Sequence, residues 1–204
     1  MNAGRLDRQF GFFREIDKEK EIGRQTYLAD ASRKENDAEH AWHMAIMAVL
    51  LAEYANEPID VLKTVTMLLI HDLVEIDAGD TFAYDEEGKK TQHARETAGA
   101  DRIFGLLPDD QQRQLRGLWE EFEEGKTPEA RFARTMDNIQ PAMLNDASGG
   151  RSWQEKGVFL DQILKRNQNT GDGSRALWEY SRKHFIEPHV AAGHIRLREQ
   201  EETN

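Results

Sequence analysis

The feature that most constrains the fold is an almost continuously apolar stretch, residues 61–70, which runs directly into His71 and Asp72. A helix that is apolar on nearly every side is typical of a central, buried position. Ionisable side chains at its end leave water only when they are paired, protonated or bound to a cation. Glu75 lies one helical turn beyond His71 and can border the same cavity. The stretch therefore predicts a helical core with a polar site built into it.

Apolar residues recur at helical spacing along the rest of the chain, and the sequence contains no convincing strand. Short segments with glycine, proline or asparagine separate the periodic runs, and none of them resembles a linker. We therefore expect an all-α fold and a single domain over residues 1–204, with a motif-bearing core at about 22–145 and a helical C-terminal extension at about 150–197. Helices are predicted at about 13–28, 41–54, 61–76, 92–106, 109–123, 128–145, 153–168 and 173–197.

The 204-residue chain contains no cysteine, which excludes disulfides, thiolate nucleophiles and zinc sites built from cysteine. Any metal must therefore be held by histidine, aspartate or glutamate. The formal net charge of −11 argues against binding to a nucleic-acid polymer, whereas a small phosphorylated metabolite can still be held by a cation and arginines. Because the sequence has no membrane-length apolar stretch and no secretion signal, we expect a cytoplasmic protein without a membrane partner.

His71 and Asp72 are adjacent on a helix and can converge only on an atom between them, such as a metal ion. Further ligands must come from other helices. His40 lies in the first turn of an amphipathic helix, for which Asp37 is a plausible N-terminal cap. Asp137 interrupts the apolar pattern of another helix. Together His40, His71, Asp72 and Asp137 predict a site of two nitrogens and two oxygens, with room for water and a substrate oxygen.

The order of these residues, His40, then His71 and Asp72, then Asp137, resembles the HD-domain superfamily of metal-dependent phosphohydrolases, whose ligands come in this order from separate helices. The resemblance spans about residues 22–145. It implies an all-α HD-domain fold with the metal site between helices. The neighbouring motifs are similar to those of the 5'-deoxynucleotidase branch: Ala38-Glu39-His40, His71-Asp72-Leu73-Val74-Glu75 and Gly79-Asp80.

Carried over by position, the resemblance makes the four residues above the metal ligands. It makes Glu75 the catalytic acid and base near the attacking water, and Asp80 a second catalytic polar group at the pocket. Arg24 matches the arginine that contacts the substrate phosphate in this branch, and its planar guanidinium suits two phosphate oxygens. The branch commonly has a tryptophan directly after that arginine, whereas this chain has Gln25, so contacts to the base or sugar can differ.

The resemblance implies a phosphomonoesterase that converts deoxyribonucleoside 5'-monophosphates to nucleoside and phosphate by attack of a metal-bound water. A nucleotide phosphodiesterase using the same metal site is an alternative, because only pocket contacts separate the two reactions. A metal-stabilised helical binding module without turnover is another. One divalent ion is expected: imidazole with carboxylate suits Mn, Co, Fe and Zn, while Mg usually prefers oxygen ligands.

Several of these residues have an ordinary structural alternative. Arg24 can pair with Glu21 or Asp30 at the surface, and Asp80 can cap the next segment or lie in a turn. His43 can be an additional ligand, but its spacing favours a structural role.

Other features are open as well. Trp42 can line the pocket or the core, and residues 80–92 can either cover the site or form a solvated connector. A homodimer is predicted from the apolar C-terminal helices, although burial in the core explains the same residues: Trp153, Phe159, Trp178 and Phe185. The remaining histidines show no comparable grouping and are interpreted as ordinary: His93, His184, His189 and His194.

Overall fold

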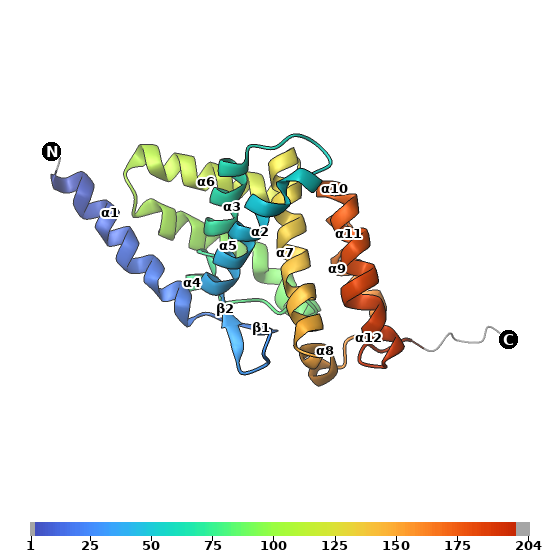
Figure 1. Ribbon diagram of the computed structural model, residues 1–204. Helices are drawn as coiled ribbons and strands as arrows, with labels where there is room; N and C mark the ends of the chain where they lie inside the picture. The colour runs from blue at the N-terminus through green and yellow to red at the C-terminus, as the bar shows by residue number, and fades with distance from the viewer. Residues whose placement is uncertain (1–2, 199–204) are drawn as a thin grey trace.

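The computed structural model describes residues 3–198, and helices dominate it (Figure 1). The helices in chain order are α1 (Ala3–Ile16), η1 (Asp17–Glu21), α2 (Asp37–Leu51), η2 (Ala52–Tyr54), α3 (Val61–Ile70), α4 (Glu75–Ala78), α5 (Glu86–Gly105), α6 (Asp109–Glu124), α7 (Pro128–Ala147), α8 (Arg151–Lys156), α9 (Leu160–Arg166), α10 (Thr170–Gly173), α11 (Arg175–Ser181), η3 (Arg182–Ile186) and α12 (Glu187–Ala191). Two strands, β1 (Gly23–Tyr27) and β2 (Lys34–Asn36), form an antiparallel hairpin between η1 and α2. The all-α fold class is confirmed, with this hairpin as its addition.

Three helices, α2, α3 and α7, pack against one another and carry the site. Their shared core is built from large side chains with no exposed surface, among them Met44, Met67, Phe132 and Met136. The prediction of a buried α3 holds for one face of the helix, where Met67 and Leu68 are completely inaccessible, whereas Leu69 is 45% exposed. The end of α3 therefore delivers the next residues, 71 and 72, into the interior.

Helix α7 lies at the centre of the molecule (Figure 1). It contacts α2 and α3 on one side and α10 and α11 on the other. Two further hydrophobic clusters flank this centre: one joins α5 and α6 to Phe12 of α1, and the other, around Trp153 and Ile163, gathers the C-terminal helices. A single domain over 1–204 stays a prediction, and residues 1–2 and 199–204 lie outside the described part of the chain.

The prediction of a helix over 13–28, and of a chain without strands, is wrong. Helix α1 ends at Ile16, and residues 23–27 pair with β2 instead. Gly23 has a low helix propensity, and the β-branched Thr26 and aromatic Tyr27 favour a strand. Both of these side chains are buried, so tertiary packing reinforces the extended conformation.

Some helix boundaries also differ from the predicted ones. The helix predicted over 61–76 ends at Ile70, and a turn separates it from the short α4. The stretch 153–168 divides into α8 and α9, because Gly157 adopts a left-handed conformation with φ 60°. None of the helices within residues 3–198 is long and apolar enough to cross a membrane.

Candidate metal centre

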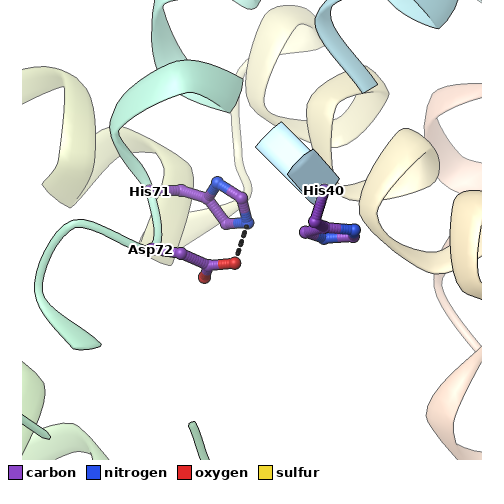
Figure 2. A group of neighbouring side chains, drawn as sticks. All are labelled: His40, His71 and Asp72. Carbon is purple, nitrogen blue, oxygen red and sulfur yellow. Dashed lines mark ion pairs between the residues drawn. The ribbon is translucent and has the colours of Figure 1, made fainter. Parts of the chain in front are cut away.

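The four predicted ligands come from separate elements and meet. His40 belongs to the first turn of α2, His71 and Asp72 follow α3, and Asp137 projects from α7. One ligand atom from each of His40, His71 and Asp72 lies within 4.8 Å of the others. Figure 2 shows the two imidazole rings and the carboxylate around one space. Asp137 Oδ1 lies 3.2 Å from His40 Nε2 and 3.9 Å from His71 Nε2, which closes the group from the side of α7.

The hydrogen bonds on the far side of each ring fix the tautomers. His71 Nδ1 lies 2.9 Å from the carbonyl oxygen of Leu68, which can only accept, so Nδ1 carries the proton. His40 Nδ1 donates in the same way to Gln140 Oε1 at 2.8 Å. Each ring, when it is neutral, then presents an unprotonated Nε2 to the centre of the group.

These Nε2 lone pairs face carboxylate oxygens. His71 Nε2 lies 3.1 Å from Asp72 Oδ2, and His40 Nε2 lies 3.2 Å from Asp137 Oδ1. Two acceptors at such a distance repel unless a positive charge lies between them. A divalent cation bound by two nitrogens and two oxygens provides this charge, so the residues fit a metal of the Zn, Mn, Co or Fe type.

The pKa values of the two histidines also reflect the need for a positive charge at the centre of the group. Burial lowers the pKa of His71, but the charge of Asp72, its hydrogen bond to the ring and the charge of Asp137 together outweigh burial and raise the pKa to about 9. Burial dominates at His40 and lowers its pKa to about 4. Without a metal, a proton on His71 therefore supplies the positive charge that a cation would replace.

Several buried polar atoms at the centre have no hydrogen-bond partner among the described residues, including His71 Nε2, Asp37 Oδ2 and Glu75 Oε2. Buried polar atoms are nearly always paired, so such a cluster of exceptions points to a missing ligand. Burial and the charges of Asp72 and Asp37 raise the pKa of Glu75 to about 11, so this carboxyl group holds a proton until a cation offsets the negative charge.

Arg24 reaches the centre from β1. Its Nη1 lies 2.8 Å from Asp72 Oδ2 and 3.0 Å from Asp37 Oδ1, so the structure does not bear out the surface pairing with Glu21 or Asp30. Burial disfavours the charged guanidinium, but the carboxylates of Asp72 and Asp37 outweigh burial and raise its pKa. The arginine is thus held rigidly beside a metal ligand.

Asp37 was predicted as the cap of α2, and this is wrong. The N-cap is Asn36, whose side chain accepts from the Glu39 N–H while Glu39 reaches back to the Asn36 N–H. The spacing Asn-x-x-Glu was the sequence signal for this capping box. Asp37 is instead completely buried and faces Arg24.

A pocket of about 210 Å³ opens beside the metal centre. Arg24, His71 and Glu75 line it together with Asp80, Phe82 and other residues of the segment that precedes α5. Asp80 is therefore a pocket residue, and the cap of α5 is Asp85. Burial raises the pKa of Asp80. The predicted loop 80–92 is shorter than expected, since α5 begins at Glu86, but its first part does border the site.

Arg166, at the end of α9, is a site residue that the sequence did not indicate. Its Nη2 lies 3.0 Å from Asp137 Oδ2 and the residue lines the pocket. Trp42 lines neither pocket nor core, because 63% of it is exposed. His43 is half-buried and lies outside the ligand group, with Nδ1 3.3 Å from Gln140 Nε2, in agreement with a structural role.

A second group of histidines lies in the C-terminal helices, contrary to the expectation that these residues are ungrouped. His189 Nε2 lies 3.0 Å from Asp146 Oδ1, and His189 Nδ1 lies 2.9 Å from His194 Nδ1. Trp153 packs edge-on against the His189 ring with centroids 5.3 Å apart. The three residues His189, His194 and Asp146 are called the C-terminal cluster below.

Comparison with known proteins agrees with this geometry. A family model described as an HD domain matches residues 16–178. A crystal structure described as a predicted metal-dependent phosphohydrolase from Magnetospirillum magnetotacticum MS-1 is similar with a TM-score of 0.89, at 46% sequence identity and over 94% of this chain and 95% of that one.

Curated relatives are more distant. The 5'-deoxynucleotidase HDDC2 of Homo sapiens is 31% identical over 111 residues, which are 54% of this chain and 53% of that protein. The protein of the same name from Danio rerio is 26% identical over 136 residues, 66% of each chain. The chain thus spans about half the length of the human relative it matches.

Proposed function

Because the chain belongs to the HD-domain family, we propose that it is a metal-dependent phosphohydrolase whose substrates are deoxyribonucleoside 5'-monophosphates. The observation that carries the proposal is the meeting of two imidazole Nε2 atoms and two carboxylates beside Glu75 and Arg24. Their buried negative charge needs a cation or a proton to offset it.

The metal ligands in this proposal are His40, His71, Asp72 and Asp137. A divalent cation held there would lower the pKa of a bound water and polarise a phosphoryl oxygen. Its identity is one of Mn, Co, Fe, Zn or Mg, with the first four favoured by the mixed nitrogen and oxygen ligands.

Three further residues have the remaining roles in this proposal. Glu75 lines the pocket with an unpartnered carboxyl oxygen, so it accepts the proton of the attacking water and returns it to the leaving oxygen. Arg24 is held by Asp72 and Asp37 through Nη1, and the rest of its fork binds a phosphate oxygen. Asp80 supplies a second polar group at the pocket wall.

The substrate class rests on the curated relatives named 5'-deoxynucleotidase. Gln25 lines the pocket where the branch commonly has tryptophan, so we expect the base and sugar contacts to differ from those of the branch. A phosphodiesterase on the same metal site, or a binding module without turnover, remains the alternative.

The deciding experiment measures phosphate release from nucleoside mono-, di- and triphosphates, and monoester formation from cyclic and linear diesters by product analysis. The protein is first stripped of metal, and Mn, Co, Mg or Zn is then restored singly. We expect release from deoxynucleoside monophosphates. Glu75→Gln should keep the metal and lower kcat by about 100- to 10,000-fold. The matched control is Glu121→Gln on α6, whose carboxylate binds Lys63 rather than the pocket.

Each outcome selects one hypothesis. Conversion of cyclic or linear diesters to monoesters, without release of phosphate from any monoester, supports the phosphodiesterase. Metal binding without turnover of any substrate supports the binding module and rules out the monoesterase.

A homodimer and a cytoplasmic location stay predictions. Trp153 is buried in the C-terminal core and cannot serve as a contact between copies. In the described residues, α2 exposes apolar side chains along one stripe: Trp42, Ile46, Val49 and Leu50. Sedimentation of wild-type and Leu50→Glu protein tests whether this stripe joins two copies.

A further inference from the structure

A buried amide stands directly behind one of the candidate metal ligands. Gln140 lies on α7, one turn after Asp137, and has no exposed surface. Its Oε1 lies 2.8 Å from His40 Nδ1, and its Nε2 lies 2.9 Å from Glu35 Oε2 and 3.3 Å from His43 Nδ1. One short segment of α7 thus provides both a ligand and the partner of another ligand.

The orientation of this amide is determined by its surroundings. Its NH₂ group has two protons, and two acceptors face it, the carboxylate of Glu35 and the Nδ1 of His43. Burial lowers the pKa of His43, which keeps that ring neutral and able to accept. The amide oxygen is then left for His40, so every donor and acceptor of Gln140 is used.

The orientation of the amide in turn selects the tautomer of His40. An oxygen facing Nδ1 requires the ring proton there, which leaves Nε2 free for the metal. A reversed amide would place N–H against Nδ1, move the ring proton to Nε2 and block coordination. It would also bring the amide oxygen against the Glu35 carboxylate.

Glu35 connects Gln140 to Arg24, the residue proposed to bind the substrate phosphate. It belongs to β2, is 2% exposed, and its Oε1 lies 3.7 Å from Arg24 Nε. The same carboxylate therefore orients Gln140 and faces the arginine that we place at the phosphate. The hairpin, which the sequence did not predict, brings both residues to the metal centre.

We propose that Glu35 and Gln140 are positioning residues that hold His40 in the tautomer able to bind the metal. Through Glu35, which faces both Gln140 and Arg24, they also connect His40 to Arg24. The proposal rests on the proposed metal site. Outer partners of metal-bound histidines typically change metal affinity by about 10- to 100-fold when they are removed.

The test uses the full chain and two readouts other than turnover. Calorimetric titration with Zn²⁺ or Co²⁺ gives the metal Kd, and ¹⁵N NMR of the metal-free protein gives the tautomer of His40, assigned with His40→Asn. Gln140→Met, which keeps the volume and removes the amide, should weaken metal binding by about 10- to 100-fold and give mixed tautomers. Thr135→Val is the control, because it removes buried hydrogen bonds from the same helix away from the ligands.

Glu35→Met is the second variant and decides alone if Gln140→Met does not fold. It removes the carboxyl acceptor of the amide, so the metal Kd should rise several-fold and His40 should again show both tautomers. A metal Kd within about twofold of wild type, with the Nδ1–H tautomer intact, overturns the proposal. Wild-type protein that binds neither ion overturns the proposed metal site instead, so the two failures are distinguishable.

Discussion

The molecule contains two groups of histidine and carboxylate, and they differ in the direction of their hydrogen bonds. In the C-terminal cluster, His189 donates from Nε2 to Asp146, which leaves its Nδ1 to accept from His194. Every contact there pairs one donor with one acceptor. At the metal centre the Nδ1–H of both rings is used on the outer side, so Nε2 of each neutral ring faces a carboxylate and only a cation, or a proton on His71, offsets the negative charge.

This difference separates a structural cluster from a binding site more clearly than residue types do. Both groups contain two histidines and aspartate at distances of about 3 Å. Only at the metal centre does buried negative charge need a cation or a proton to offset it. Among the described residues, only there do buried carboxyl groups such as Glu75 have an oxygen without a hydrogen-bond partner. The outer partner of each ring decides its chemistry.

The largest expected effect comes from removing one ligand. His71→Ala should weaken Zn²⁺ or Co²⁺ binding on the order of 1,000-fold, because losing an outer partner alone costs about 10- to 100-fold. Phosphate release should disappear with it. The matched variant His189→Ala should leave both quantities within about threefold of wild type.

Calorimetry and the phosphate assay check this pair. Equal loss of metal in the two variants would mean that the C-terminal cluster also binds the ion, and the comparison would fail.

The second expected effect is on stability and belongs to the C-terminal cluster. Gly150 has φ +71°, and a Cβ atom there would lie 2.6 Å from His189 Nδ1. Gly150→Ala should therefore lower the free energy of unfolding by about 4 kcal/mol through strain and overpacking, without changing the metal Kd. Urea unfolding measures it, with Gly105→Ala, where the new Cβ meets nothing within 4 Å, as the control. A shifted metal Kd would contradict the separation of the two clusters.

The sequence indicated the residues that converge at the candidate metal centre because its signals are local. The apolar run of α3 ends at His71, and the order of the histidines and aspartates matched that of a known family. The hairpin was missed because β2 has only three residues, too few to show alternation. Without the hairpin, nothing indicated that Asp37 and Glu35 turn inward to meet Arg24.

Arg166 and the C-terminal cluster depend on tertiary contacts that have no local signature. Arg166 lies at a helix end, where a basic residue is ordinary, and only the packing of α9 brings it to Asp137. His189 and His194 come together through the turn after α12, a geometry that spacing alone does not specify.

The third prediction concerns excess negative charge at the metal centre. Burial, together with Asp72 and Asp37, raises the pKa of Glu19 to about 7 from 4.5. A raised carboxyl pKa contributes stability below pH 4.5 that is lost as pH rises through 7. In metal-free protein, Glu19→Gln should thus match wild type near pH 4.5 and exceed its free energy of unfolding by up to about 3 kcal/mol at pH 8.

Urea titrations across this pH range check the difference. Added Zn²⁺ should reduce it, because a cation offsets the charges that act on Glu19. A difference that does not vary with pH would contradict the assignment.

The smallest expected effect is at His43. Its ring accepts a long hydrogen bond of 3.3 Å from Gln140 and lies outside the ligand group. His43→Ala leaves Gln140 held by Glu35, so the metal Kd should change by no more than about threefold, the value of one weak hydrogen bond. Calorimetric titration beside His40→Ala gives the contrast between neighbours on α2. A loss at His43 as large as that at His40 would make it a fifth ligand, and the outer partner of Gln140 would have to be found elsewhere.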